Sequence, residues 1–165
     1  MIALQIEDLK QFTKKLFLQE TFDNFLVKEV NIVTYNSFTI DGHIRHGFYS
    51  AEELEENRIE ELSAWRALRP FCFSIIKGNK LPLSFSIVLL LAPANVEKVL
   101  KQNGLSLNAA DVNGLYINIR YENGRLNCIT GTSLNLFTLD KTLDQIWDQM
   151  VKLFLKQNEI PCQEA

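Results

Sequence analysis

Apolar and polar residues alternate on both sides of Asn123-Gly124, within residues 113–131. An Asn-Gly pair between two alternating runs predicts a β-hairpin with a two-residue type I′ turn, which needs positive φ at both turn positions. Such a turn fixes the register, so that Glu122 faces Arg125 and Ile119 faces Cys128. Because strand side chains alternate between faces, the hairpin has an apolar face and a polar face. The apolar face carries Leu115, Ile117, Ile119, Tyr121, Leu126 and Cys128, and the polar face carries Tyr116, Asn118, Arg120, Glu122, Arg125 and Asn127.

A hairpin with these two faces predicts an antiparallel sheet with solvent on one side and helices on the other. The best-marked helix follows the hairpin, where apolar residues form one stripe at helical spacing over residues 143–155. Asp140 or Thr142 can cap its start, and we expect the helix to pack on the hairpin. The tail from Glu159 is expected to be frayed.

The other helices are marked by their first turns and by prolines. Apolar spacing predicts a helix over residues 7–18, and a capping box that starts at Ser50 predicts one over residues 51–68. Pro70 disfavours a helical conformation in the residue before it, so we expect this helix to end there and a short, deeply buried helix to cover residues 71–77. Pro93 opens a further helix, which Gly104 ends.

The remaining strands are read from β-branched and aromatic runs. Residues 25–35 and 83–91 are predicted strands, and the second is expected to be central in the sheet. Residues 38–40 and 43–45 flank Asp41-Gly42, which reads as a second hairpin turn. That register places apolar Ile40 opposite His43, and a local conflict of this kind sometimes marks a functional site.

These elements predict an α+β fold: an antiparallel sheet of five to seven strands with helices packed mainly on one face. The expected order is α, β, β, β, α, α, β, α, β, β, α. At 165 residues, the chain is expected to form a single domain, residues 1–165.

Composition narrows the functional classes. A net charge of −3 and the lack of a long basic run argue against nucleic-acid binding. The most apolar run, residues 81–92, is too short to cross a membrane, and the N-terminus lacks the features of a signal peptide. Three cysteines without ligand spacing fit a reducing compartment. We therefore expect a soluble, cytoplasmic protein with no metal and no cofactor.

The only two histidines give the one candidate catalytic cluster. His43 and His46 lie close to Asp41, and a histidine beside a carboxylate can act as a general base or a metal ligand. On a strand, however, positions i and i+3 point to opposite faces, so the two imidazoles converge only if the strand ends between them. The sequence contains no Walker loop, dinucleotide fingerprint, H-E-x-x-H or G-x-S-x-G motif.

Two other groups are candidates for binding. Arg66 and Arg69 lie one helical turn apart and can hold an anion together, or can pair with glutamates of their own helix and cap its carbonyls. On the polar face of the hairpin, Tyr116, Asn118 and Arg120 form a mixed aromatic and polar surface.

Several segments together resemble a family of uncharacterised, single-domain proteins from anaerobic Gram-positive gut bacteria. The segments include Arg69-Pro70-Phe71-Cys72-Phe73, Asn118-Ile119-Arg120-Tyr121-Glu122-Asn123-Gly124, and Phe137-Thr138-Leu139-Asp140-Lys141. The resemblance spans nearly the whole chain. It implies a small intracellular bacterial protein and supplies no catalytic residue.

Two hypotheses of function follow. The first is a non-enzymatic binding or protein-interaction module, possibly a homodimer, with an unknown protein or small molecule as its partner. Its surface is expected to be the polar sheet face or a gap between that face and the His43 turn. The alternative is a small hydrolase or transferase that uses His43 or His46 as base, oriented by Asp41 or by a glutamate of the helix predicted over residues 51–68. The two differ in whether those side chains meet in one concave site.

Overall fold

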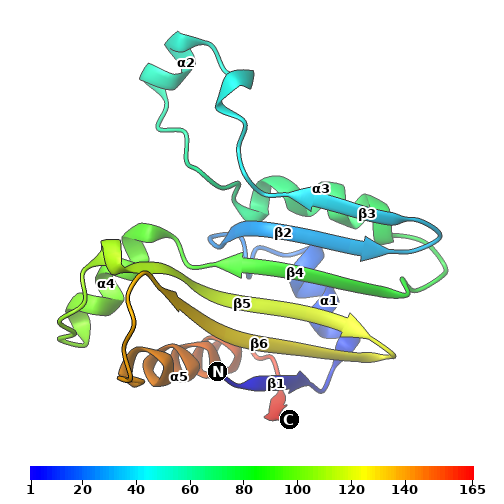
Figure 1. Ribbon diagram of the computed structural model, residues 1–165. Coiled ribbons are helices and arrows are strands. Elements are labelled where there is room, and N and C mark those ends of the chain that lie inside the picture. Colours follow the sequence, from blue (N-terminus) through cyan, green and yellow to red (C-terminus); the bar gives the residue numbers. More distant parts are fainter.

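The computed structural model describes residues 1–165 and contains one seven-stranded antiparallel sheet (Figure 1). The strand order is β3-β2-β4-β5-β6-β1-β7. The strands are β1 Ala3–Ile6, β2 Leu26–Val33, β3 Ser37–Asp41, β4 Ser84–Leu90, β5 Val112–Glu122, β6 Arg125–Leu134 and β7 Cys162–Glu164. The predicted α+β class is confirmed, with the largest number of strands expected.

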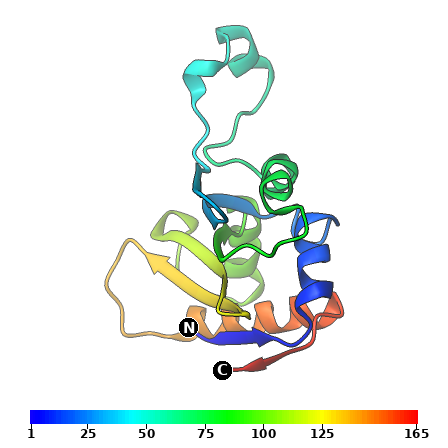
Figure 2. The ribbon, with the colours of Figure 1, turned by 90° about the vertical axis from the view of Figure 1, so that its right-hand side faces the viewer.

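The main helices gather on one face of the sheet, and α2 stands away from it (Figures 1 and 2). The helices are α1 Leu9–Phe17, α2 Ala51–Glu56, α3 Trp65–Ile76, α4 Pro93–Gln102 and α5 Thr142–Gln157. Short 3₁₀ turns cover His46–Phe48 and Ala109–Asp111. Residues from α4 and α5 line a common groove, so these two helices are neighbours. The opposite face of the sheet carries no helix.

The long hairpin β5–β6 has the predicted register. Glu122 pairs with Arg125 and Ile119 with Cys128, and both Asn123 and Gly124 have positive φ. Apolar side chains of the hairpin are buried against the stripe of α5 that the sequence predicts, formed by Leu143, Trp147, Val151 and Leu155. Each large side chain buried in this way contributes roughly 1.5–3 kcal/mol.

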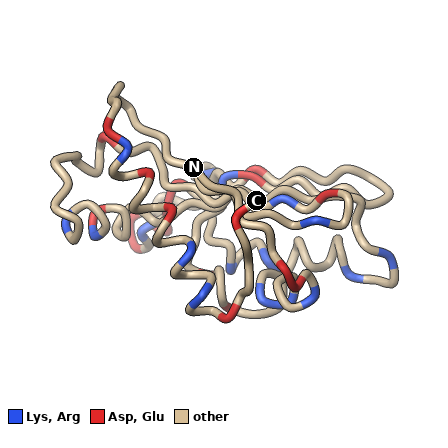
Figure 3. Tube along the Cα trace, turned by 90° about the horizontal axis from the view of Figure 1, so that it is seen from below, with Lys and Arg blue, Asp and Glu red and all other residues tan.

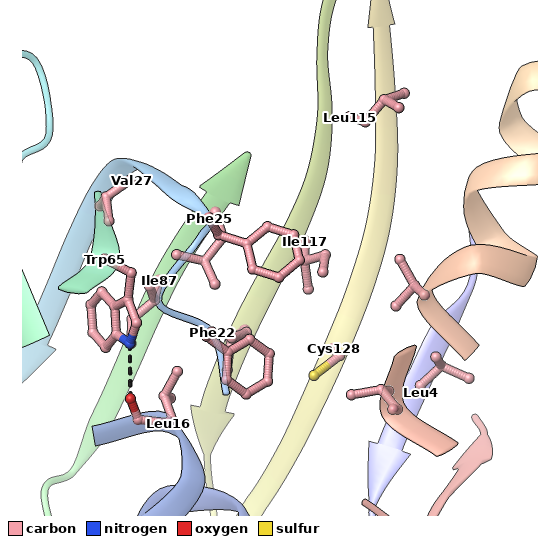
Figure 4. Close-up of a cluster of buried hydrophobic side chains, with 14 of the residues drawn as sticks. Leu4, Leu16, Phe22, Phe25, Val27, Trp65, Ile87, Leu115, Ile117 and Cys128 are labelled. Atoms are coloured by element: carbon pink, nitrogen blue, oxygen red, sulfur yellow. Dashed lines mark hydrogen bonds between the residues drawn. The ribbon is translucent and has the colours of Figure 1, made fainter. Parts of the chain in front are cut away.

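Aromatic side chains fill the other half of the core. Phe22 contacts Phe12, Phe25 and Phe154 through edge or tilted ring pairs. Trp65 is fully buried, and its indole N–H donates to the Leu16 carbonyl at 2.8 Å (Figure 4). This bond ties the start of α3 to the end of α1 and satisfies the only polar atom of the Trp65 side chain.

The predicted hairpin at Asp41-Gly42 is wrong. β3 pairs with β2 through a turn at residues 34–36, and residues 43–45 form only an isolated bridge, between His43 and Leu62. Gly42 is instead required by a close approach: it is buried beside the β2 bulge, where a Cβ atom would lie 1.8 Å from the Val27 carbonyl oxygen. The sequence identifies the glycine, but it does not predict that the β2 backbone packs against it.

The helix boundaries around Pro70 also differ from the prediction. α2 ends at Glu56, and α3 starts at Trp65 and runs through Pro70. Backbone bonds explain the break, because Ser63 donates to Gly42 and accepts from Val27. Strand-like pairing of residues 61–64 therefore overrides local helix propensity. The C-terminal part of α3 is not deeply buried, since Phe71 is 66% exposed.

Both chain ends add strands that were not predicted. β1 pairs with β6, and the tail, which was expected to be frayed, forms β7 on the outer side of β1. Each strand is too short to be recognised alone: β1 has four residues and β7 three. They form strands because β1 pairs with β6 of the long hairpin and β7 pairs with β1.

Gly42→Ala should destabilise the protein by about 1–3 kcal/mol or more, because the added methyl group overlaps the β2 backbone. The matched control is Gly47→Ala, where no atom lies within 4 Å of the added Cβ atom. The control should stay within about 0.5 kcal/mol of the wild type. Urea unfolding followed by circular dichroism measures both, and equal stability of the two variants would contradict this account of Gly42.

Candidate functional site

Asp41 and His43 are in direct contact at the end of β3. The Asp41 Oδ1 atom accepts the His43 backbone N–H at 3.0 Å and lies 2.6 Å from the His43 Nδ1 atom. The Asp41 Oδ2 atom accepts from Arg45 at 3.1 Å. The backbone hydrogen bond from His43 is the main cause that lowers the pKa of the Asp41 carboxyl. All three side chains are exposed, so solvent weakens these interactions.

His46 does not join this cluster. It starts the exposed 3₁₀ turn, and its side chain makes no hydrogen bond or ion pair. None of the principal cavities is lined by Asp41, His43 or His46. No group of three or more His, Cys, Asp or Glu side chains is arranged to hold a metal ion. The pair Asp41 and His43 is thus a contact on an open surface.

The cluster lies at the root of a projecting segment, residues 43–62, which we call the arm (Figure 1). Ile44 donates its N–H to the Glu61 carbonyl, and His43 bridges Leu62, so the two sides of the arm meet at its base. The hydrogen bonds of Asp41 shape the chain as it leaves β3. In the structure, Asp41 and His43 join the end of β3 to the base of the arm.

Arg66 and Arg69 do not form a joint anion site. Arg69 makes two 2.9 Å hydrogen bonds to the Asp23 carboxylate, and both side chains are largely buried. Arg66 is exposed and unpaired. The partner of Arg69 is neither a glutamate of its own helix nor a helix carbonyl, but a residue 46 positions earlier. Periodicity within one helix could not identify Asp23, because the pair forms only when α3 packs beside α1.

Tyr116, Asn118 and Arg120 lie on the helix-free side of the sheet, which we call the open face. The Asn118 Oδ1 atom accepts from Ser86 at 3.2 Å, and the Lys28 ammonium lies 5.4 Å from the Tyr116 ring centroid. Arg120 is exposed and forms no ion pair. The sequence prediction placed these three side chains on one face correctly.

Strand register extends this surface across the whole sheet. Arg120 pairs with Ser86 on one side and Asn127 on the other, and the same row continues to both edges. All of its members carry hydrogen-bonding side chains: Thr39, Asn31, Ser86, Arg120, Asn127, Gln5 and Gln163. Figure 3 shows acidic and basic residues interspersed along the chain. Within the row, Arg120 is the only charged side chain, so the row is polar without being strongly charged.

An open hollow of about 460 Å³ lies on this face beside the hairpin turn. Its lining is Arg120, Glu122, Asn123, Arg125, Asn127 and Ile129. Neither arginine has a carboxylate within 4.0 Å. The side-chain oxygen of Asn127 is buried and has no hydrogen-bond partner, although buried polar atoms are usually satisfied. The hairpin register predicted that Arg125 and Asn127 lie on this face. Only the structure shows that these two side chains have no partners.

Fold and surface define an α+β protein with helices on one side of an open antiparallel sheet. The chain belongs to a family of unknown function, DUF5721, whose model matches residues 15–163. Neither the curated proteins nor the solved structures give a match. No helix has the length and apolar character needed to cross a membrane.

Arg69→Ala should destabilise the protein by about 3 kcal/mol, because it leaves the buried Asp23 carboxylate without its partner. Arg66→Ala is the matched control on the same helix and should change stability by less than about 0.5 kcal/mol. Thermal unfolding followed by circular dichroism compares them. A minor effect of Arg69→Ala would show that the ion pair is not needed for α3 to dock.

Thiol labelling should distinguish the three cysteines, all of which are free. Burial raises the pKa of the Cys72 thiol to about 12 and raises that of Cys128 further, so both stay protonated in the native protein near pH 8. Because the thiolate is the reactive form, iodoacetamide should modify neither until the protein unfolds. Cys162 is half-buried and should react first. Rapid native labelling of Cys128, read by peptide mass spectrometry, would contradict the packing of the hairpin.

Proposed function

We propose that this protein is a non-enzymatic binding module and that the open face is its binding surface. The single observation that carries the proposal is the one-sided placement of the helices, which leaves a row of hydrogen-bonding side chains across all seven strands on the face that no helix covers. Exposed polar groups on a rigid scaffold suit recognition more than packing.

The hollow beside the hairpin turn indicates the chemistry of the ligand. Arg120 and Arg125 have guanidinium groups without carboxylate partners, and such groups bind carboxylates or phosphates in a bidentate manner. Glu122 lies in the same hollow and offsets one positive charge. The site therefore suits a ligand with one acidic group at this end and hydrogen-bonding groups that extend along the row, such as an acidic peptide segment.

A second candidate is the small hydrolase or transferase with a site at His43 or His46. The observation in its favour is the 2.6 Å contact between Asp41 and the His43 imidazole, which resembles the orienting pair of a general base. Against it, both side chains are exposed and line no principal cavity, whereas substrate sites are usually concave. The binding module is therefore the better supported function.

We also propose that the protein acts in the cytoplasm of a bacterium. Three unpaired thiols support a reducing compartment. The resemblance of the sequence to proteins of anaerobic Gram-positive gut bacteria supports the source.

A titration of ¹⁵N-labelled protein with a short poly-glutamate peptide tests the proposal. Amide shifts should change on β4, β5 and β6 around Arg120 and Arg125, and the double variant Arg120→Ala, Arg125→Ala should bind at least about tenfold more weakly. The matched control is Arg45→Ala combined with Arg58→Ala, which removes two exposed arginines from the arm.

Unchanged binding by the Arg120 and Arg125 double variant would contradict the proposal that these arginines bind the acidic group of the ligand. Shifts confined to the helices or the arm would remove the open face as the binding surface.

A further inference from the structure

We propose that two copies of this chain assemble through their β3 strands, and that the arm of each copy packs against the other. The proposal uses the edge of the sheet and does not depend on a ligand at the open face. It rests on four features: an unprotected edge, a self-complementary strand, an arm without a core of its own, and matched charge on the surface that the arm would meet.

The two edges of the sheet differ in how they are protected. β7 has only three residues, follows Pro161 and carries Glu164, so it offers little to a further strand. β3 has five residues, Ser37–Asp41, without proline, lysine or a bulge. An edge of this kind is a template for pairing with another chain.

The hydrogen-bond pattern shows which groups of β3 are free. Gly42 donates its backbone N–H to the Lys28 carbonyl of β2. Along an antiparallel strand, residues whose backbone groups point to one neighbouring strand alternate with residues whose backbone groups point the other way. Ile40 and Phe38 therefore direct their backbone groups to β2. Ser37, Thr39 and Asp41 direct theirs away from the sheet, where no other strand lies.

This strand is complementary to itself. In an antiparallel pair centred on Thr39, Ser37 faces the partner's Asp41, and the outward groups meet in about six backbone hydrogen bonds. On the helix side, Phe38 faces the partner's Ile40, and both residues are half-buried in one copy. No like charges stand opposite each other, which would destabilise the pair.

The arm lacks a core within its own chain. None of residues 43–62 is buried, and α2 has only six residues, whereas an isolated helix of fewer than about 12–15 residues is marginal in water. The arm nevertheless carries apolar side chains, among them Phe48, which is 86% exposed. It extends beyond the β3 edge of the sheet (Figures 1 and 2).

Two-fold pairing brings the arm to an apolar surface of the partner. The arm leaves the C-terminal end of β3, so in an antiparallel pair it lies next to the partner's turn between β2 and β3. Tyr35 in that turn is 88% exposed. Leu83, which donates its N–H to Val33 beside the turn, and Leu81 are also highly exposed. One arrangement thus covers apolar side chains at both ends of the edge.

Charge favours the same arrangement. α2 carries Glu52, Glu53, Glu55 and Glu56. The loop that precedes Leu81 contains Lys77 and Lys80, which are exposed and have no carboxylate partner. An acidic arm of one copy would therefore meet a basic loop of the other, which identifies a second copy as the occupant of the edge.

Sedimentation velocity over a concentration series tests the proposal on the full chain. We expect the wild type to form a dimer and Thr39→Pro to be monomeric, because proline removes an outward N–H that β2 does not use. The matched control, Thr39→Val, keeps the N–H and should remain dimeric. A monomeric wild type, or a dimeric Thr39→Pro, would overturn the proposal.

A charge reversal tests the arm even if Thr39→Pro fails to fold. Lys77→Glu with Lys80→Glu should weaken the dimer at least about tenfold, and adding Glu52→Lys with Glu53→Lys should restore it. Absence of rescue would remove the arm from the interface. Arg120→Ala with Arg125→Ala should leave the dimer intact, so loss of ligand binding at the open face and loss of assembly are separate results.

Discussion

The structure depends on the burial of one face of the β5–β6 hairpin by α5. The Trp147 indole is buried between α5 and the hairpin, and its N–H donates to the Tyr116 carbonyl at 2.8 Å. This packing commits one side of the sheet to the core. β1 and β7 then add beside β6, and β4 and β2 add beside β5. Because α1, α3 and α4 share the side of α5, the opposite face is left to solvent. The function that we propose uses that asymmetry.

Sequence reasoning succeeded where a feature depends on neighbours in the chain. The turn at Asn123-Gly124 and strict alternation determine the hairpin register, and helical spacing determines the buried stripe of α5. The positions of Tyr116, Asn118 and Arg120 on the polar face followed from the same alternation. These features need no knowledge of the rest of the fold.

Sequence reasoning failed where a distant segment decides the local structure. Gly42 reads as a turn residue but is required by the approach of β2, and Pro70 reads as a helix boundary but lies inside α3. The ion pair of Arg69 joins two residues that are 46 positions apart in the chain. The hollow at Arg120 could not be found either, because unpaired arginines are recognised only when every nearby carboxylate has been placed.

Site-specific photo-crosslinking in cells tests the central claim most directly. A benzoylphenylalanine residue at position 118 lies on the open face, and one at position 74 lies on the exposed side of α3. We predict a discrete crosslinked product from position 118 and none from position 74. No product from position 118, or the same product from both positions, would contradict the assignment of the open face as the binding surface.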